Sequence, residues 1–295
     1  MRDTAGGGAQ GVELEVNSRV PGHESRDAEP PTRPVASEPP PRAPQLLVLD
    51  LGLTPYDDAW ALQKRAAAAR ISGELPEDLL ILVQHPPVVT LGRSTKPGHL
   101  LATPERLESL GIALRDVERG GDVTIHEPGQ LVVYPIIDLK RHRKDLHWYL
   151  RQIEEGIIRA LATFGLTCGR VPGLTGVWRG EDPIARRKLA SIGVHARDWV
   201  TWHGVALNVS NDLQTFDFTV PCGIDGVSMG TVWRECVSAG LPVPEFAAVQ
   251  QAVVDALADV FTLQPIALSS ALSARDGNAK WEQVCAALHI GHGHT

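Results

Sequence analysis

Two reactive side chains, a cysteine and a lysine, lie in short glycine-containing segments of this chain. Cys222 stands between Pro221 and Gly223 in TVPCGI, which favours a turn or a strand end where a substrate can reach the thiol. An unassisted thiol has a pKa of about 8.5 and is mostly protonated at neutral pH, so it needs a neighbouring base or cation to act as a nucleophile. Lys188 or a histidine could supply that base. Taken alone, Cys222 would also suit a buried structural thiol.

Lys188 opens the segment KLASIGVHAR, and small or apolar residues follow it. This run, 189–193, could seat the stem of the lysine, while Gly193 exposes the main chain to a ligand. Burial disfavours the charged form of an amine, so a lysine held in this way can act as a base. The alternative is an ordinary solvated lysine, which the neighbouring Arg186 and Arg187 would also fit.

A third segment, RGGDVTIHEPGQLVVYP (119–135), places glycines, a histidine and a second turn in a pattern that otherwise alternates like strands. Gly120 and Gly121 permit positive φ and carry no side-chain bulk, so a ligand can lie against the main chain. Alternation puts Asp122, Thr124 and His126 on one face of the strand. The residues expected in the core are Val123, Ile125, Leu131 and Val133. The segment predicts one wall of a pocket; the alternatives are an ordinary β-bulge and a structural histidine.

Metal binding has little support in the sequence. The four cysteines form no CxxC pair; they are Cys168, Cys222, Cys236 and Cys285. His195 and His203 lie in consecutive strand-like segments, but neither HExxH spacing nor a compact carboxylate cluster accompanies them. We therefore expect no metal and no cofactor.

The composition limits the class of protein. The 295 residues are 43% hydrophobic and 21% charged, values typical of soluble globular proteins. A formal net charge of -7 gives no overall attraction to nucleic acids or anionic membranes, so neither is an expected partner. No apolar run reaches the roughly eighteen residues of a membrane helix, and the N-terminus has no signal-peptide pattern. With scattered thiols, these features predict a cytoplasmic protein.

The reactive segments are embedded in a mixed pattern of strands and helices. Apolar alternation or short apolar runs predict strands at 45–52, 79–85, 88–94, 112–118, 122–126, 131–135, 176–180, 188–197, 199–210 and 216–224. Helical periodicity predicts helices at 55–73, 104–111, 146–165, 244–263 and 278–290. Without a regular βαβ rhythm, this mixture indicates a single α/β or α+β domain over 45–290. Residues 1–44, rich in Gly, Pro, Ser and charge, predict a disordered arm, and 291–295 a flexible tail.

Four segments together resemble the lipoyl(octanoyl) transferase family, which comprises octanoyl-[acyl-carrier-protein]:protein N-octanoyltransferases. They are RGGDVTIHEPGQLVVYPIIDL, KLASIGV, WHGVALNVSNDL and FTVPCGI, in that order. The resemblance runs from about Leu46 to Cys236. It implies the fold of biotin and lipoate ligases: a mixed, mostly antiparallel sheet with flanking helices and a smaller second sheet.

The resemblance also implies roles for particular residues. A cysteine and a lysine form the catalytic dyad of the family, and here they match Cys222 and Lys188. The residues that match its acyl pocket are Arg119, Gly120, Gly121, Asp122, Val123, Thr124, Ile125, His126, Ser191, Ile192, Gly193, Gly204, Val205 and Ala206. Thr124 and His126 are expected to fix the polar end of the acyl group, while the chain lies against the glycines. Burial of seven chain carbons would contribute roughly 5 kcal/mol.

Partners follow from the same resemblance. The implied donor is octanoyl-acyl carrier protein, and the implied acceptors are lipoyl domains of 2-oxoacid dehydrogenases and the glycine cleavage H protein. Because such carriers are acidic, Arg119, Arg186 and Arg187 are expected to receive them. Residues 225–232 depart from the family pattern and are given no role. The alternatives are an ATP-dependent lipoate or biotin ligase, a lipoyl amidotransferase, and a non-enzymatic module that binds an acyl group or a metal.

Overall fold

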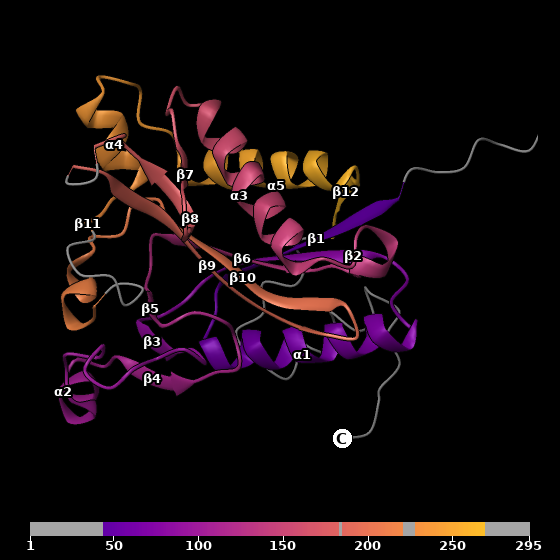
Figure 1. The fold of residues 1–295 in the computed structure, drawn as a ribbon, viewed down its shortest axis with the longest axis horizontal. Coiled ribbons are helices and arrows are strands. Elements are labelled where there is room, and N and C mark those ends of the chain that lie inside the picture. Colours follow the sequence, from indigo (N-terminus) through magenta and orange to yellow (C-terminus); the bar gives the residue numbers. More distant parts are fainter. Residues whose placement is uncertain (1–43, 183–184, 221–227, 269–295) are drawn as a thin grey trace, which may run out of the picture. The chain divides into compact units, whose positions relative to one another are not determined.

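The computed structural model describes residues 44–182, 185–220 and 228–268 (Figure 1). Several sequence-based expectations lie outside these residues: the arm at 1–43, the helix at 278–290 and the tail at 291–295. Cys222 also lies outside them, in the interval between Val220 and Ser228. The described residues all belong to one unit of the chain, Arg42–Thr295.

The main sheet joins strands from both ends of the described chain. In order across the sheet lie β12 (Gln264–Ala267), β1 (Gln45–Leu53), β2 (Asp78–Gln84), β6 (Gln130–Ile136), β10 (Val200–Asn208), β9 (Arg187–Arg197), β8 (Leu174–Arg179) and β7 (Gly169–Val171), with β11 (Ser228–Met229) beside β9. The pairs β12–β1, β1–β2 and β11–β9 are parallel, and the other neighbours are antiparallel. The predicted mixed, mostly antiparallel sheet is confirmed.

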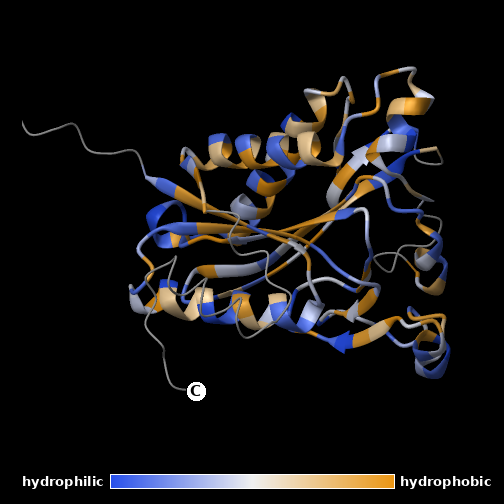
Figure 2. Cartoon of the chain, turned by 180° about the vertical axis from the view of Figure 1, so that it is seen from behind, coloured by the Kyte–Doolittle hydropathy of each residue, from blue (hydrophilic) through white to orange (hydrophobic). Residues whose placement is uncertain are grey.

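Helices cover both faces of this sheet. They are α1 (Tyr56–Ser72) on one face, and α3 (Leu146–Ala162) and α5 (Phe246–Phe261) on the other (Figure 1). Successive residues of β2 point to opposite faces, so Leu80 packs with α3 and α5 while Leu79 packs with α1. Because both faces are covered, the central strands are largely apolar, as Figure 2 shows. Within the described residues, no helix is long and apolar enough to cross a bilayer.

A smaller second sheet carries the glycine-rich segment. Its strands, in order, are β4 (Ala113–Asp116), β3 (Val88–Leu91) and β5 (Val123–His126), and α2 (Pro104–Ser109) packs beside them. Val123 and Ile125 point into an apolar cluster with Leu107 of α2. Thr124 and His126 therefore face the opposite way, toward the main sheet.

One predicted strand is wrong in its described part. Residues Gln214–Phe218, where the strand at 216–224 was predicted to begin, form a 3-10 helix, η2. Leu213 has a φ of 74°, and the Asp212 carboxylate accepts a hydrogen bond from Gln214 N, so the chain turns before alternating residues can pair. The helix α4 (Val232–Ser238) holds Cys236, which was expected to lie in a helix. The strands β7, β11 and β12 were not expected, because two to four residues are too few for periodicity to detect.

Candidate functional site

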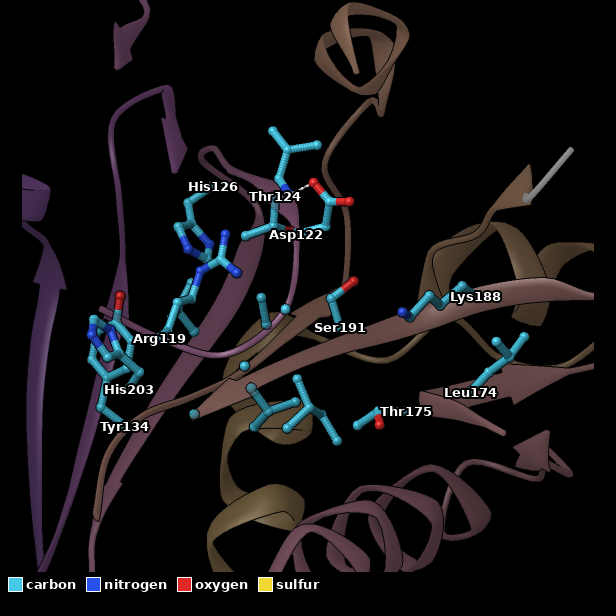
Figure 3. A pocket seen from close by; sticks show the side chains of 18 of the residues that line it. Arg119, Asp122, Thr124, His126, Tyr134, Leu174, Thr175, Lys188, Ser191 and His203 are labelled. Atoms are coloured by element: carbon cyan, nitrogen blue, oxygen red, sulfur yellow. Dashed lines mark hydrogen bonds between the residues drawn. The ribbon is translucent and has the colours of Figure 1, made fainter. Parts of the chain in front are cut away.

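A cavity of about 280 Å³ lies between the two sheets (Figure 3). Its walls come from β5 of the second sheet, from β6, β9 and β10 of the main sheet, from the start of β8, and from Tyr56 at the start of α1. This volume is close to the lower end of the range for small-molecule sites, about 300–1,000 Å³. The cavity therefore suits a small ligand.

Most of the residues that the resemblance assigned to a pocket line this one cavity. They are Arg119, Gly121, Asp122, Val123, Thr124, His126, Ser191, Ile192, Gly193, Gly204, Val205 and Ala206, together with Lys188. Gly120 and Ile125 do not line it. Gly120 N donates to Val194 O at 2.8 Å, and Ile125 is buried in the cluster on the other face of β5. Cys222 lies outside the described residues.

Lys188 is buried, with only 2% of its surface exposed, and its side chain points into the cavity (Figure 3). Its Nζ lies 5.1 Å from the centre of the Trp178 ring, close enough for a cation–π contact. The main chain of Lys188 is also held, because its carbonyl accepts a hydrogen bond from Gly230 N at 3.0 Å and Met229 pairs with it across β11–β9. The expected solvated alternative for Lys188 is therefore wrong.

Gly176, on the neighbouring strand β8, makes room for this lysine. Its φ is 127°, and a Cβ there would lie 2.6 Å from Lys188 Cε and 2.5 Å from Ala190 O. Gly176 N donates to the Glu154 carboxylate of α3 at 3.0 Å, and Arg170 pairs with the same carboxylate. The helix thus fixes the strand against which the lysine packs.

Arg119 is buried, with 6% of its surface exposed. Its guanidinium donates to Thr90 O at 2.7 Å and to Thr90 Oγ1 at 2.8 Å. The expectation that Arg119 receives an acidic carrier at the surface is therefore wrong, because the side chain forms part of the cavity wall. Arg187 pairs with Glu235, and Arg186 is half-buried.

Two glycines of the cavity allow main chains to approach one another. A Cβ on Gly193 would lie 2.7 Å from Gly120 O, and one on Gly204 would lie 2.2 Å from Val133 O. Contacts under 3 Å force the neighbouring atoms to move, and here those atoms are backbone carbonyls. These glycines are needed for strand packing even without a ligand.

His99 connects the cavity wall to the chain that precedes Cys222. Its Nδ1 donates to the Asp122 carboxylate at 2.5 Å, and its own carbonyl accepts a hydrogen bond from Val220 N at 2.8 Å. Asp122 lines the cavity, and its second oxygen accepts from Val123 N at 2.7 Å. No local sequence pattern indicates a role for His99, because 23 residues separate it from Asp122.

Aromatic rings stand at the end of the cavity away from Lys188. We call this group the ring wall; its members are Tyr56, His85, His126, Tyr134 and His203. The rings contact one another in series, from the stacked pair Tyr56–His126, with centroids 5.9 Å apart, to Tyr134–His203, with centroids 6.4 Å apart. Figure 3 shows His126, Tyr134 and His203 together at this end.

Burial keeps the histidines of the ring wall neutral. It lowers the pKa of His85 to about 4, lowers the pKa of His126 well below its usual value, and also lowers the pKa of His203. His126 Nδ1 pairs with Gln130 Oε1 at 2.8 Å. His203 Nε2 has no hydrogen-bond partner among the described residues and lies 3.6 Å from the Glu118 carboxylate. It is thus an unsatisfied polar atom of a side chain that lines the cavity.

The two cysteines in the described part of the chain are poor nucleophiles. Burial raises the pKa of Cys168 to about 12 and also raises the pKa of Cys236, which is fully buried. Both thiols are therefore protonated at neutral pH. No group of three or more His, Cys, Asp or Glu side chains in the described ranges is arranged to hold a metal ion.

Sequence reasoning missed several side chains of the cavity. Tyr56 and Tyr134 were given no role, and His203 was considered only as a metal ligand. Tyr134 follows Val132 at the two-residue spacing of β6, so the alternation of a strand could have placed both on one face. For Tyr56, which reaches the cavity from α1, no such pattern exists.

The fold and the cavity define a catalytic domain of the lipoyl ligase type. The model of the lipoyl protein ligase A/B catalytic domain matches residues 55–258. Among solved structures, lipoate-protein ligase A bound with ATP aligns with a TM-score of 0.57 at 14% identity, covering 85% of this chain and 100% of that one. The bipartite lipoate protein ligase of Thermoplasma acidophilum aligns with a TM-score of 0.56 at 16% identity, covering 86% and 99%. At such low identity these two structures establish the fold alone.

Sequence relatives identify the family within this class. The octanoyltransferase of Synechococcus sp. (strain WH7803) is 45% identical over 216 residues, which cover 72% of this chain and 82% of the relative. That of Gloeobacter violaceus is 43% identical over 233 residues, covering 78% and 98%. The chain belongs to the lipoyl(octanoyl) transferase family, as the four sequence segments indicated, and it is an acyltransferase.

Proposed function

We propose that this protein transfers an octanoyl group from acyl carrier protein to a lysine of lipoyl domains, through a thioester on Cys222. The acceptors are lipoyl domains of 2-oxoacid dehydrogenases and the glycine cleavage H protein. The observation that carries the proposal is that the buried Lys188 points into a small cavity of this chain, in the space that an acyl group would occupy. The sequence relatives of the chain are octanoyltransferases.

The residues on both sides of the interval 221–227 support Cys222 as the nucleophile. On one side, Val220 is held by His99, whose ring binds Asp122 of the cavity wall. On the other side, Ser228 and Met229 pair with β9 at Arg187 and Lys188. Two residues of chain span at most about 7 Å, so the main chain of Cys222 stays within that distance of Val220. This reach suits a nucleophile that works at the cavity.

Comparison of the cysteines supports the same choice. Cys168 and Cys236 are buried thiols whose raised pKa values hold them in the protonated form. Cys285 lies outside the described residues, in a segment predicted to be helical. Cys222 follows a proline and precedes a glycine, a sequence context that favours a turn.

The proposed reaction has two acyl transfers. Lys188 accepts the proton of the Cys222 thiol, and the sulfur attacks the thioester carbonyl of octanoyl-acyl carrier protein. The carrier leaves as a thiol after taking back that proton. The neutral amine of a lipoyl-domain lysine then attacks the new thioester and passes a proton to Lys188. Lys188 returns this proton to the Cys222 sulfur as that sulfur leaves, which restores the thiol and the neutral lysine. Exchange of one thioester for another is nearly balanced and amide formation is downhill, so ATP is not needed.

The test is to incubate the full chain with octanoyl-acyl carrier protein in the absence of ATP and to measure its intact mass. We expect a gain of one octanoyl group, mapped by peptide analysis to Cys222 and lost when a lipoyl domain is added. Activity that requires free octanoate and ATP would instead indicate a ligase. Faster transfer from an octanoylated lipoyl domain would indicate an amidotransferase, and stoichiometric binding without turnover would indicate a binding module.

Replacement of Gly176 with alanine tests the seating of Lys188. The new methyl group would meet Lys188 Cε and Ala190 O, so the amine must shift. Because misplacement of a reacting group by about 1 Å can cost a hundredfold in rate, we expect acylation by octanoyl-acyl carrier protein to slow by at least about tenfold. The measurement is the rate of acyl-enzyme formation by rapid quench and mass spectrometry.

A matched control separates contact from backbone strain. Gly240 also has a positive φ, 65°, but a Cβ there would meet nothing within 4 Å. Gly240→Ala should therefore cost about 1–2 kcal/mol of stability without slowing acylation. Equal rates for the two folded variants would show that Gly176 does not position the lysine.

A further inference from the structure

The two ends of the cavity differ in chemistry. Figure 3 shows Lys188 and Thr175 at one end, Tyr134 and His203 at the other, and Ser191 between them. Apolar side chains line the cavity as well; they are Val123, Val132, Leu174, Ile192, Val205 and Ala206. If acyl transfer takes place at Lys188, an acyl chain that enters the cavity extends toward the ring wall. His126, which was expected to fix the polar end of the acyl group, then faces its far end.

The ring wall is held from behind by buried hydrogen bonds. The Tyr134 hydroxyl pairs with His85 Nε2 at 2.8 Å, and His85 Nδ1 donates to Thr54 O at 2.7 Å. The main-chain N–H of His203 donates to Gln63 Oε1 of α1 at 2.9 Å. No ring of the wall is more than 5% exposed. The Tyr134 and His85 rings could move aside only by breaking these bonds without access to water, and the rings of the other three members pack against them. The wall therefore forms a fixed end to the cavity.

His203 makes this end unfavourable for hydrocarbon. Its Nε2 lacks a hydrogen-bond partner among the described residues, although the side chain is 99% buried and lines the cavity. The nitrogen is covered by protein atoms and lies 3.6 Å from the Glu118 carboxylate, so it offers no polar contact to a ligand in the cavity. A chain long enough to reach the His203 ring would have to displace this buried side chain, so carbons beyond the wall are not accommodated.

We propose that the ring wall sets the length of the acyl chain that the enzyme accepts, with His203 as the residue that disfavours chains longer than octanoyl. This specificity role rests on the proposed octanoyl transfer. Neither His203 nor Tyr56 takes part in the chemical steps at Lys188, so altering them should change which chain is preferred.

The test uses acyl carrier proteins loaded with hexanoyl, octanoyl, decanoyl or dodecanoyl groups. For each donor, kcat/KM for acylation of the full chain is measured. In His203→Gly the ring is removed, and glycine tolerates the φ of 57° at this position. Each newly buried CH₂ is worth about fourfold in affinity, so with two added groups the ratio of decanoyl to octanoyl activity should rise by about fifteenfold. Tyr56→Leu opens the wall from α1, and a smaller shift in the same direction is expected.

Tyr149→Leu is the matched control for Tyr56→Leu. Tyr149 is fully buried, but it packs against α5 on the opposite face of the main sheet and does not line the cavity. Its loss should lower stability and leave the preference for octanoyl in place. If either wall variant folds, as judged by thermal melting, and keeps the wild-type order of chain lengths, the proposal is wrong. Failure of every chain to acylate the wild-type protein would instead contradict the proposed function.

Discussion

Replacement of Cys222 with serine is expected to abolish octanoyl transfer. A serine hydroxyl has nearly the same size as the thiol but is a far weaker nucleophile, so no acyl-enzyme should accumulate. Loss of a nucleophile that works together with a base lowers turnover by at least about a thousandfold. The measurement is twofold: octanoylation of a lipoyl domain over time, and the intact mass of the variant after incubation with octanoyl-acyl carrier protein.

The chain supplies its own control for this experiment. Cys168→Ser makes the same change at a thiol that burial keeps protonated, so transfer by this variant should remain close to the wild-type rate. Circular dichroism and thermal melting of both variants show whether each is folded. Near-normal transfer by folded Cys222→Ser would contradict the thioester mechanism, whatever the outcome for the control.

The second sheet and the pocket segment show what the sequence could predict. In Val123–His126, alternation alone assigned Val123 and Ile125 to a core and Thr124 and His126 to the opposite face, and the structure agrees. The prediction works because the side-chain period of a strand is two and one face is buried against apolar neighbours. Val123 is the exception among these four residues, because it contacts the apolar core and also lines the cavity.

The features that the sequence could not predict depend on residues far apart in the chain. The ring wall joins Tyr56 of α1 to His126 and His203, which lie about 70 and 147 residues further on. Gly176 lies 12 residues before Lys188 in the chain, and its positive φ is needed because the Lys188 side chain of the next strand packs against it. Such pairings are fixed by strand order and register, which local periodicity does not encode.

The position of Lys188 also shows why its neighbours in the sequence could not decide whether the side chain is solvated or buried. Arg186 and Arg187 precede it and suggested a solvated end of the strand. In the structure β9 begins at Arg187, which is half-buried against Glu235 of α4, and one residue later Lys188 is buried. The transition from surface to interior within two residues is set by β8 and β11, which flank β9 here.

Replacement of Lys188 with methionine is expected to slow formation of the acyl-enzyme by about a hundredfold to ten-thousandfold at neutral pH, the usual contribution of a general base. Methionine keeps an unbranched stem in the buried slot beside Trp178 and removes only the amine. The measurement is single-turnover acylation by octanoyl-acyl carrier protein. Lys140→Met, at an exposed lysine that does not line the cavity, is the control and should acylate at the wild-type rate.

The pH dependence of the variant distinguishes a base from a packing residue. Without Lys188, acylation should follow the fraction of thiolate, which for an ordinary thiol of pKa about 8.5 rises roughly twentyfold between about pH 7 and pH 9. Acylation of the variant should therefore recover as the pH is raised, after subtraction of spontaneous thioester hydrolysis measured without enzyme. If the lysine only filled space, the rate of the variant relative to the wild type would stay constant with pH. A constant ratio would remove Lys188 from the proton transfers and leave the thiol to be activated by another group.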